Sequence, residues 1–393
     1  MLRILSVFGT RPEAIKMAPV VKELQKYPEW IQSKICVTGQ HREMLDQVLE
    51  LFQIEPDYDL NIMQERQALS QVTAEVLAGL DPIIQQETPD WLLVQGDTAT
   101  VMAATLVAFY HRVRVGHIEA GLRTWNKYHP FPEEISRKVT DAICDLHFAP
   151  TETAKRNLLQ EGVDERSIIV TGNTVIDALL ETVKKKYDFS SGSLAGIPLD
   201  RRIILVTAHR RENFGRPLEN ICQALLTIAE RHDSDVHIVY PVHLNPNVQE
   251  PVYSLLSGKR NISLVDPLPY LPFVHLMNRS YLLLTDSGGL QEEAPSLGKP
   301  VLVLREVTER PEAVEAGMAK VVGTDSARIV RETTYLLEDQ KEYERMARAV
   351  NPYGDGQASR RIVQALLDHS RRVLDTLFDY ESGDLKNEQA TCV

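Results

Sequence analysis

Cysteine is scarce in this chain, and long hydrophobic runs are missing from it. The four cysteines, Cys36, Cys144, Cys222 and Cys392, lie far apart and have no CxxC spacing. Their scatter argues against a structural zinc site and favours a reducing compartment. The first residues, MLRILSVFGTRPEAIK, hold too short an apolar run for a signal peptide, and no apolar segment approaches the ~20 residues that a membrane span needs. We therefore expect a cytoplasmic protein that does not insert into a membrane.

An excess of positive charge is also lacking. The 393 residues include 43 Lys and Arg against 55 Asp and Glu, which gives a formal net charge of −12 and argues against nucleic acid as a partner. A local basic pocket for a small anionic ligand is still compatible with this charge. The hydrophobic content of 43% and the charged content of 25% are ordinary for a soluble globular protein. The length indicates two domains.

A GxGxxG dinucleotide fingerprint is absent, and the chain is organised instead around residues 281–300, YLLLTDSGGLQEEAPSLGKP. The spacing predicts a buried parallel strand at 281–284 and a helix at 290–296. Ser287, Gly288 and Gly289 turn the chain between them. Glycines let a ligand approach the backbone, and the N-terminus of the helix offers free N–H groups for a phosphate.

Two carboxylates, Glu292 and Glu293, lie too far into this helix to be ordinary caps. A carboxylate at this place can accept hydrogen bonds from both hydroxyls of a ribose. The alternative interpretation is a tight strand-to-helix turn followed by two solvated glutamates, because short motifs often mislead.

The N-terminal half begins with a predicted strand at 2–8 and a predicted helix at 14–27. Arg11 lies in the turn between them, at the sheet edge where open α/β sheets bind ligands, so it is either a phosphate contact or a surface arginine. A second strand at 34–38 is followed by His41, which could likewise contact a ligand. A loop at 57–63 and a helix at 69–87 come next.

Acidic residues follow two successive strands of this half. Asp97 comes after a strand at 91–94, and Glu119 after a strand at 113–118. Glu133 lies in a proline-stiffened loop, PFPEE, before a helix at 135–143. Loops at one sheet edge can gather all three carboxylates around a single pocket. The alternative is that each is a helix cap, as Asp97 before Thr98 could be.

The second half repeats the alternation of strands and helices. A strand at 202–207 leads to His209, Arg210 and Arg211, a concentrated anion site; a strand at 236–241 leads to His243. The pattern predicts the α/β class with doubly wound parallel sheets. Residues 184–200 break the alternation. We expect an N-terminal domain at 1–172, joined by a C-terminal helix at about 366–380, a second domain at 173–365, and a frayed tail at 381–393.

These blocks, taken together, resemble the bacterial non-hydrolysing UDP-N-acetylglucosamine 2-epimerases. The resemblance runs through FGTRPEAIKMAP, TGQHREMLDQ, GDT, HIEAGLRT, PFPEE, TGNTVIDAL, HRREN, YPVHLNPNV, DSGGLQEEAPSLGKPV, TERPEA and NPYGDG, in order along nearly the whole chain. It implies a glycosyltransferase-B-like fold, in which two Rossmann-like domains face each other across a cleft and the C-terminal one holds most of the UDP.

The resemblance also implies a reaction. Members of this family convert UDP-GlcNAc reversibly to UDP-ManNAc, eliminating UDP to give 2-acetamidoglucal and adding it back, which supplies ManNAc for cell-surface polysaccharide. They work without a nicotinamide cofactor or a catalytic metal, so we expect no cofactor here. A homodimer is the expected assembly.

Site residues are carried over by the same motifs. The implied acids and bases are Asp97, Glu119 and Glu133, without an assignment of base and acid, while His209 would help the diphosphate to leave. Substrate contacts are expected from the glycine turn, the ribose carboxylate, basic side chains and one aromatic ring: Arg11, Lys16, Phe273, Ser287, Gly288, Gly289, Glu293 and Arg310.

A second nucleotide-sugar site, at which the substrate UDP-GlcNAc activates turnover, is also implied by the resemblance. The matching residues are Gln40, His41, Arg66, Arg210 and His243. Two positions depart from the family: His129 replaces a frequent Ser, and Ser136 replaces a usual Asn. Both lie near Glu133.

Three other functions are weighed against this one. A hydrolysing epimerase would release ManNAc and UDP from a similar cleft, and a retaining glycosyltransferase would share the architecture. A sensor would bind the nucleotide sugar without turnover. The three carboxylates and His209 favour an epimerase, because proton transfer at C2 needs such groups.

Overall fold

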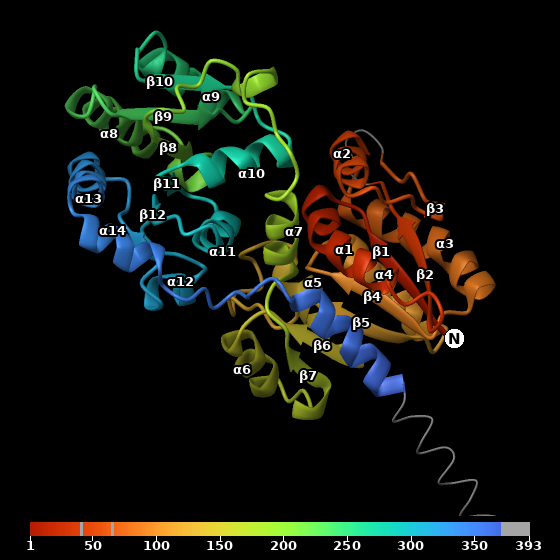
Figure 1. The fold of residues 1–393 in the computed structure, drawn as a ribbon. Helices are drawn as coiled ribbons and strands as arrows, with labels where there is room; N and C mark the ends of the chain where they lie inside the picture. The colour runs from red at the N-terminus through yellow and green to blue at the C-terminus, as the bar shows by residue number, and fades with distance from the viewer. Residues whose placement is uncertain (40–41, 64–66, 371–393) are drawn as a thin grey trace, which may run out of the picture. The chain divides into compact units, whose positions relative to one another are not determined.

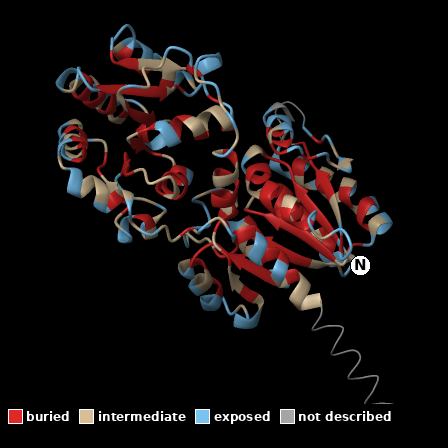
Figure 2. Ribbon diagram, in the orientation of Figure 1, coloured by how far each residue is buried: buried red, intermediate tan, exposed pale blue. Residues whose placement is uncertain are grey.

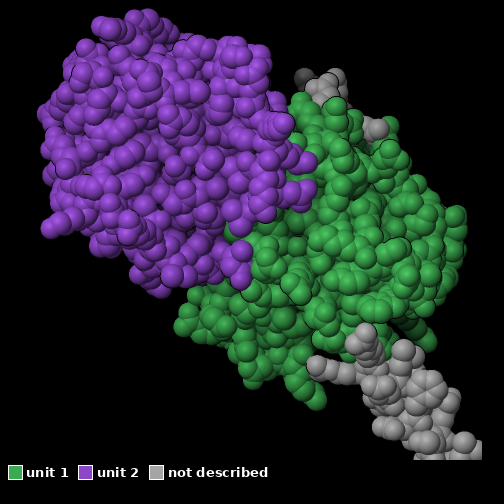
Figure 3. Space-filling view, in the orientation of Figure 1, with its two compact units in different colours: residues 1–177, 356–393 green, residues 178–355 purple. Residues whose placement is uncertain are grey.

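The computed structural model describes residues 1–39, 42–63 and 67–370. The chain forms two compact units, residues 1–177 with 356–393 and residues 178–355 (Figure 3). The domain boundaries expected after residues 172 and 365 stay predictions. In the described residues, no helix is both long enough and apolar enough to cross a membrane.

The described residues of the first unit form a seven-stranded parallel sheet in the order β3-β2-β1-β4-β5-β6-β7 (Figure 1). Its strands are β1 (Leu2–Phe8), β2 (Ile31–Val37), β3 (Tyr58–Asp59), β4 (Trp91–Gln95), β5 (Arg114–Ile118), β6 (Leu146–Ala149) and β7 (Ile168–Val170). The strand order reverses direction between β1 and β4, which makes that pair the topological switch point of the sheet.

Helices lie between these strands along the chain, and one that runs past the unit boundary at residue 177 follows β7. They are α1 (Arg11–Leu24), α2 (Arg42–Phe52), α3 (Leu69–Glu87), α4 (Ala99–Tyr110), α5 (Glu133–Ile143), α6 (Glu152–Gln160), η1 (Glu165–Ser167) and α7 (Thr174–Thr182), and a further helix covers 358–370. Helix α4 consists mostly of alanine, valine and threonine, and it packs between α3 and α5. The small alanine, threonine and valine side chains that it buries allow this close packing.

The second unit has a six-stranded parallel sheet in the order β10-β9-β8-β11-β12-β13. The strands are β8 (Arg202–Thr207), β9 (Val236–Pro241), β10 (Ile262–Val265), β11 (Leu282–Thr285), β12 (Val301–Val303) and β13 (Ala319–Val321). The helices are η2 (Gly192–Leu194), η3 (Arg211–Asn213), α8 (Arg216–Arg231), α9 (Pro246–Leu256), α10 (Tyr270–Arg279), α11 (Gly288–Ser296), α12 (Pro311–Glu315), α13 (Ser326–Glu338) and α14 (Gln340–Ala347). Here the switch point lies between β8 and β11.

Each unit has its own hydrophobic core. Figure 2 shows buried strands inside each unit, with exposed residues on the outer faces of the helices. In the first unit the core joins β1, β2, β4 and β5 to α3 and α4; in the second it joins β8, β9 and β11 to α8, α9 and α13. Strands buried on both faces explain the continuous apolar runs that predicted them.

The predicted elements agree with this fold except near their ends. The strand at 2–8 and the helix at 69–87 are confirmed as β1 and α3. Helix α1 begins at Arg11 rather than at residue 14, because Thr10 caps it through Glu13 N–H and Glu13 in turn accepts from the backbone of Thr10. The loop predicted at 57–63 contains the short strand β3.

Candidate active site

The candidate site of the first unit lies at its switch point, where β1, β4 and β5 end. Gln95 ends β4 opposite Ile118, the last residue of β5, so Asp97 and Glu119 follow neighbouring strand ends. Gly96 has φ +82 and Glu119 has φ 69. These left-handed backbone conformations turn the chain sharply at the edge where open α/β sheets bind ligands.

Glu119 is held by donors from three other elements. Lys16 Nζ of α1 lies 2.6 Å from both carboxylate oxygens. Gln95 Nε2 donates to Oε2 at 2.5 Å, and Asn173 Nδ2 donates to Oε1 at 2.8 Å. The carboxylate is 7% exposed. Because one ammonium and two amides donate to it, its anionic form is favoured.

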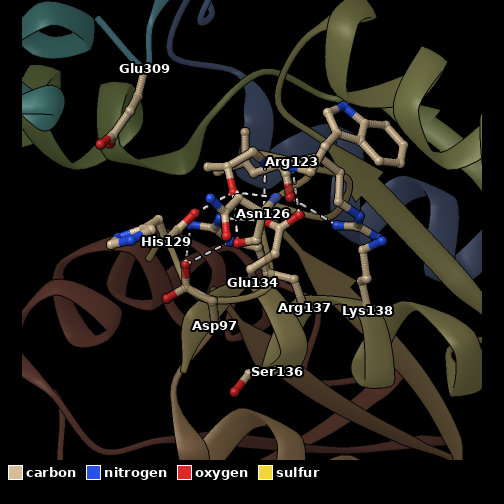
Figure 4. A network of polar contacts seen from close by, with 12 residues as sticks. Asp97, Arg123, Asn126, His129, Glu134, Ser136, Arg137, Lys138 and Glu309 are labelled. Carbon is tan, nitrogen blue, oxygen red and sulfur yellow. Dashed lines mark hydrogen bonds and ion pairs between the residues drawn. The ribbon is translucent and has the colours of Figure 1, made fainter. Parts of the chain in front are cut away.

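Asp97 forms an ion pair with a guanidinium of α5, the helix between β5 and β6 (Figure 4). Arg137 of α5 donates from Nε to Asp97 Oδ2 at 2.8 Å, and its Nη2 lies 2.5 Å from the same oxygen. Nη1 of Arg137 reaches Glu134 at 3.5 Å. The helix N-cap at this strand end is Thr98, whose side chain accepts from Val101 N–H. The interpretation of Asp97 as a helix cap is therefore wrong.

Glu134 fastens the loop before α5. This completely buried carboxylate accepts from the backbone N–H groups of Thr124 and Trp125, both at 3.0 Å. Glu133 is the first residue of α5 and not part of a preceding loop, with Pro132 at the N-cap. Oε2 of Glu133 is buried and has no hydrogen-bond partner among the described residues. The sequence pattern does not single out Glu134, because the partners that bury it come from residues 124 and 125.

A buried ion network lies behind the ends of β4 and β5. His117 of β5 places Nδ1 2.6 Å from Asp141 Oδ1 and Nε2 2.7 Å from the carbonyl oxygen of Gly96. The ring is therefore held at both nitrogens inside the protein. Arg123 also reaches Asp141, at 2.7 Å. Burial raises the pKa of Asp141, but His117 and Arg123 outweigh it and lower this pKa to about 2.

Glu13 is a further carboxylate that sequence reasoning did not single out. It accepts from the backbone of Gly9 at 2.7 Å and from Thr98 Oγ1 at 2.5 Å, so it ties the ends of β1 and β4 together. Burial raises its pKa, against the lowering effect of these hydrogen bonds. Gly9 must lack a side chain, because a Cβ there would lie 1.8 Å from Thr38 Oγ1. Arg11 opens α1 at this same edge.

The candidate site of the second unit lies at the switch point between β8 and β11. Ser287 is the N-cap of α11, and Gly288 and Gly289 form its first turn. A Cβ added to Gly288 would lie 3.7 Å from Arg210 Nη2 and 3.9 Å from Arg310 Cζ. Two guanidinium groups therefore lie beside the free N–H groups of a helix N-terminus, an arrangement suited to phosphate.

The two glutamates of α11 are buried, so the interpretation of solvated glutamates is wrong. Glu292 pairs with the guanidinium of Arg310, and Glu293 Oε2 accepts from Tyr270 OH at 3.4 Å. Glu293 also lies close to the turn, since Oε1 is 3.5 Å from where a Cβ of Gly289 would be. Phe273, half-buried, is on the same helix as Tyr270.

His209 stands after β8 with its side chain 38% exposed. Its ring stacks on that of His243 at 5.3 Å between centroids and 23° between planes. Asp286 accepts from the backbone N–H groups of His209 and Arg210, both at 2.8 Å. Arg210 also lies 3.8 Å from Glu309. Burial lowers the pKa of His209, as do His243 and Arg210, while Asp286 raises it.

The predicted site residues thus fall into two described groups, one in each unit. Three residues predicted for the second nucleotide-sugar site, Gln40, His41 and Arg66, lie outside the described residues, while Arg210 and His243 lie next to His209. Among the described residues no group of three or more His, Cys, Asp or Glu is arranged to hold a metal ion. A cavity of about 650 Å³ in the first unit is lined by Arg166, Arg361 and His369 among others, and by none of the predicted site residues.

The chain has two units, each with a parallel sheet and a candidate site at the switch point of that sheet. This architecture is glycosyltransferase-B-like. A solved structure of Anabaena HepE in complex with UDP and glucose shares this fold, with a TM-score of 0.60 over 94% of this chain and 100% of that one. At 12% identity this likeness shows the fold alone.

The family follows from closer relatives. The model of the UDP-N-acetylglucosamine 2-epimerase family matches residues 22–367. The UDP-N-acetylglucosamine 2-epimerase of Escherichia coli K12 is 58% identical over 371 residues, 93% of this chain and 98% of that protein. The crystal structure of the Neisseria meningitidis UDP-GlcNAc 2-epimerase bound to UDP-GlcNAc has a TM-score of 0.84 and 51% identity, covering 93% of this chain and 100% of that one. The chain belongs to the UDP-N-acetylglucosamine 2-epimerase family, so the resemblance noted in its motifs is confirmed.

Proposed function

We propose that this protein interconverts UDP-GlcNAc and UDP-ManNAc by eliminating UDP across C1–C2 and adding it back. The observation that carries the proposal is the Glu119 carboxylate, held as an anion by Lys16, Gln95 and Asn173 next to Asp97. Positioned carboxylates at one sheet edge suit proton transfer at carbon. The product would be available for cell-surface polysaccharide, and the cytoplasm is the expected compartment.

In the first step, a carboxylate takes the C2 proton as the C1–O bond breaks. The electron pair of the C2–H bond forms the C1=C2 bond of 2-acetamidoglucal, and that of the C1–O bond goes to the β-phosphate of UDP. Asp97, Glu119 and Glu133 are the candidate bases. Glu119 accepts from an ammonium and two amides, whereas Glu133 Oε2 has no hydrogen-bond partner among the described residues.

In the return step, a carboxylic acid gives a proton to C2 from the opposite face while the β-phosphate oxygen attacks C1. The two steps need one carboxylate ionised and another protonated, and separated environments supply that difference.

Binding of UDP is assigned to the second unit. The first turn of α11, with Arg210 and Arg310 beside Gly288, suits the diphosphate. Glu293 suits the ribose hydroxyls, and Phe273 suits the uracil. Arg11 and Lys16 of α1 are assigned to substrate contacts from the first unit. His209 is assigned to the departing phosphate, where the negative charge grows during elimination.

Proton NMR of UDP-GlcNAc with the purified protein in D2O tests the proposal. The expected result is growth of a UDP-ManNAc signal, with deuterium entering C2 of both sugars. Free ManNAc with stoichiometric UDP would instead identify a hydrolysing epimerase. Binding without exchange at C2 would identify a sensor, and the roles given to the three carboxylates would then be wrong.

Activation by a second molecule of UDP-GlcNAc is also part of the proposal, through Gln40, His41, Arg66, Arg210 and His243. The expected kinetics are sigmoidal in UDP-GlcNAc, and UDP-ManNAc alone should turn over poorly until a trace of UDP-GlcNAc is added. Hyperbolic turnover of UDP-ManNAc without UDP-GlcNAc would overturn this part. A homodimer is the proposed assembly, which sedimentation of the purified chain would test.

A further inference from the structure

Asp286 is a completely buried carboxylate whose two oxygens have different surroundings. It follows β11, directly before the glycine turn. Oδ2 accepts from His209 N and Arg210 N, both at 2.8 Å, and from Asn213 Nδ2 at 3.0 Å. Oδ1 is equally buried and has no hydrogen-bond partner among the described residues. Since leaving a buried carboxylate oxygen without a partner is unfavourable, its orientation requires a reason.

The unpartnered oxygen faces the ring of His209. Asp286 Oδ1 lies 3.9 Å from Nδ1 of His209, an ion-pair distance that is too long for a hydrogen bond. A small rotation of the imidazole would close it, and catalytic hydrogen bonds are often long before substrate binds. The ring is partly exposed while Asp286 is inaccessible, so a ligand can touch His209 but not the carboxylate behind it.

The charges around His209 give Asp286 a distinct task. The groups that act on the ring are Arg210 in its own loop, His243 after β9 and Asp286 after β11. Burial, His243 and Arg210 all lower the pKa of His209, and Asp286 raises it. Of these groups, the carboxylate is the one that favours the imidazolium. His243 accepts from Asn245 N–H at Nδ1, 3.1 Å away, which holds its ring in the stack against His209.

We propose that Asp286 is a positioning residue that orients His209 through Nδ1 and supplies the negative charge against which this ring is protonated beside a bound diphosphate. The inference rests on the proposed function, because that function assigns His209 to the departing UDP. The ring takes its proton from solvent when the anion binds. As the C1–O bond breaks, its electron pair adds one negative charge to the β-phosphate, and the imidazolium stabilises that charge.

The alternative is that Asp286 only ties the loop 209–213 to β11. For that task a carbonyl oxygen is enough, because the three donors all meet Oδ2. Asp286→Asn therefore keeps an acceptor for these donors while removing the charge and the second acceptor oxygen. Asn213→Ala is the matched control, since it removes one donor to Oδ2 and leaves the charge unchanged.

The experiment is a ¹⁵N NMR titration of the histidine rings in the full chain, with His209 assigned by its loss in His209→Asn. In the unmodified protein the neutral ring should carry its proton on Nδ1, and UDP should raise the pKa of His209. In Asp286→Asn this pKa should fall by about 1 unit or more, as expected for the loss of a charge within ~4 Å. Asn213→Ala should shift it by less than about 0.3 unit, and Asp286→Glu, which restores the charge, should recover part of the fall.

A second readout is the affinity for UDP as a function of pH. In Asp286→Asn, binding should weaken about tenfold near neutral pH, and its decline should begin at lower pH. An unchanged His209 titration in folded Asp286→Asn, or an equal shift in Asn213→Ala, would overturn the inference. If Asp286→Asn does not fold, a neutral His209 ring protonated on Nε2 in the unmodified protein would overturn it. Should the predicted shifts appear without any exchange at C2 in D2O, the proposed function would fail while the role of Asp286 towards a bound anion would stand.

Discussion

Each unit buries an aspartate that faces a histidine, and the two pairs differ in how far they are closed. In the first unit Asp141 lies 2.6 Å from Nδ1 of a completely buried His117. In the second unit Asp286 lies 3.9 Å from Nδ1 of the partly exposed His209. The first ring has an acceptor at each nitrogen, Asp141 and the Gly96 carbonyl. The second keeps one edge accessible.

This difference indicates that His117 supports the structure, whereas His209 is placed to respond to a ligand. A histidine whose two nitrogens are both engaged inside the protein cannot contact a substrate, but it can hold the backbone that presents Asp97. A histidine with a loose carboxylate behind it can change its protonation state when an anion arrives. The same two residue types are thus used for rigidity in one unit and for response in the other.

The largest effect should come from opening the closed pair. In Asp141→Asn, the buried Arg123 keeps Glu161 but loses the other of its two carboxylate partners, and His117 loses the carboxylate at Nδ1. The free energy of unfolding should therefore fall by about 3–5 kcal/mol. Urea unfolding followed by circular dichroism would measure this. The matched control is Asp164→Asn, which breaks the exposed pair with Arg166 and should leave stability unchanged. If both variants had the same free energy of unfolding, Asp141 would not stabilise the fold more than an exposed ion pair does.

The pH dependence of stability sharpens the same point. The folded pKa of Asp141 is about 2, below an unfolded value of about 4. The stabilisation is therefore fully present above pH ~4 and is lost as the pH falls towards 2. Denaturation of the unmodified protein and of Asp141→Asn should differ most at pH 5–7 and converge on acidification. A gap that stays constant down to pH ~2 would contradict the assignment.

Breaking the open pair should affect turnover more than folding. His209→Asn should lower kcat about 10²–10³-fold, because the charge on departing UDP loses its partner, while the melting temperature changes little. His117→Asn should lower the melting temperature more than His209→Asn does, and it should lower kcat less. Thermal melts and the D2O exchange rate, measured on both variants, check the contrast. A His209→Asn protein with normal exchange would remove His209 from the reaction.

A smaller effect is expected from Arg137, which holds Asp97. Arg137→Lys keeps a positive charge but replaces the planar guanidinium that reaches Asp97 and Glu134 together. We expect about a tenfold fall in kcat with little change in KM, measured in the direction from UDP-GlcNAc. Lys155→Gln, which removes a surface pair with Glu165, is the control and should keep normal kinetics.

The smallest effect is expected at His129, one of the two departures from the family. Its imidazole is exposed and makes no hydrogen bond or ion pair with any described residue, whereas its carbonyl oxygen accepts from Thr124 Oγ1 (Figure 4). His129→Ser leaves that carbonyl in place, so kcat/KM should change less than about twofold. A change above fivefold would show that the ring itself takes part in the reaction.

Local patterns in the sequence were enough to predict the alternation of strands and helices. They were also enough to place Arg11, Asp97, Glu119, His209 and the glycine turn at strand ends, because apolar runs and turn residues report local structure directly. The sequence also predicted that these residues lie at the carboxyl edge of a sheet, since parallel strands end at the same edge.

The partners of these residues could not be predicted in the same way. Lys16 and Glu119 are separated by 103 positions, and Asp286 and Asn213 by 73. Such pairs follow from which crossover packs beside which strand, and periodicity does not encode that. The start of α5 was placed two residues late because Pro130 and Pro132 were interpreted as a stiff loop, although proline is compatible with a helix start.

Asp177 connects two distant parts of the chain within the first unit. It accepts from Ala358 N at 3.2 Å and from Ser359 N at 2.8 Å, and so binds the start of the helix at 358–370. During synthesis, 181 residues separate Asp177 from Ala358, which takes about 10–40 s at ~5–20 residues per second. The whole of residues 178–355 leaves the ribosome in that interval. The unit encoded in the middle can therefore finish folding before the unit encoded first receives the helix at 358–370.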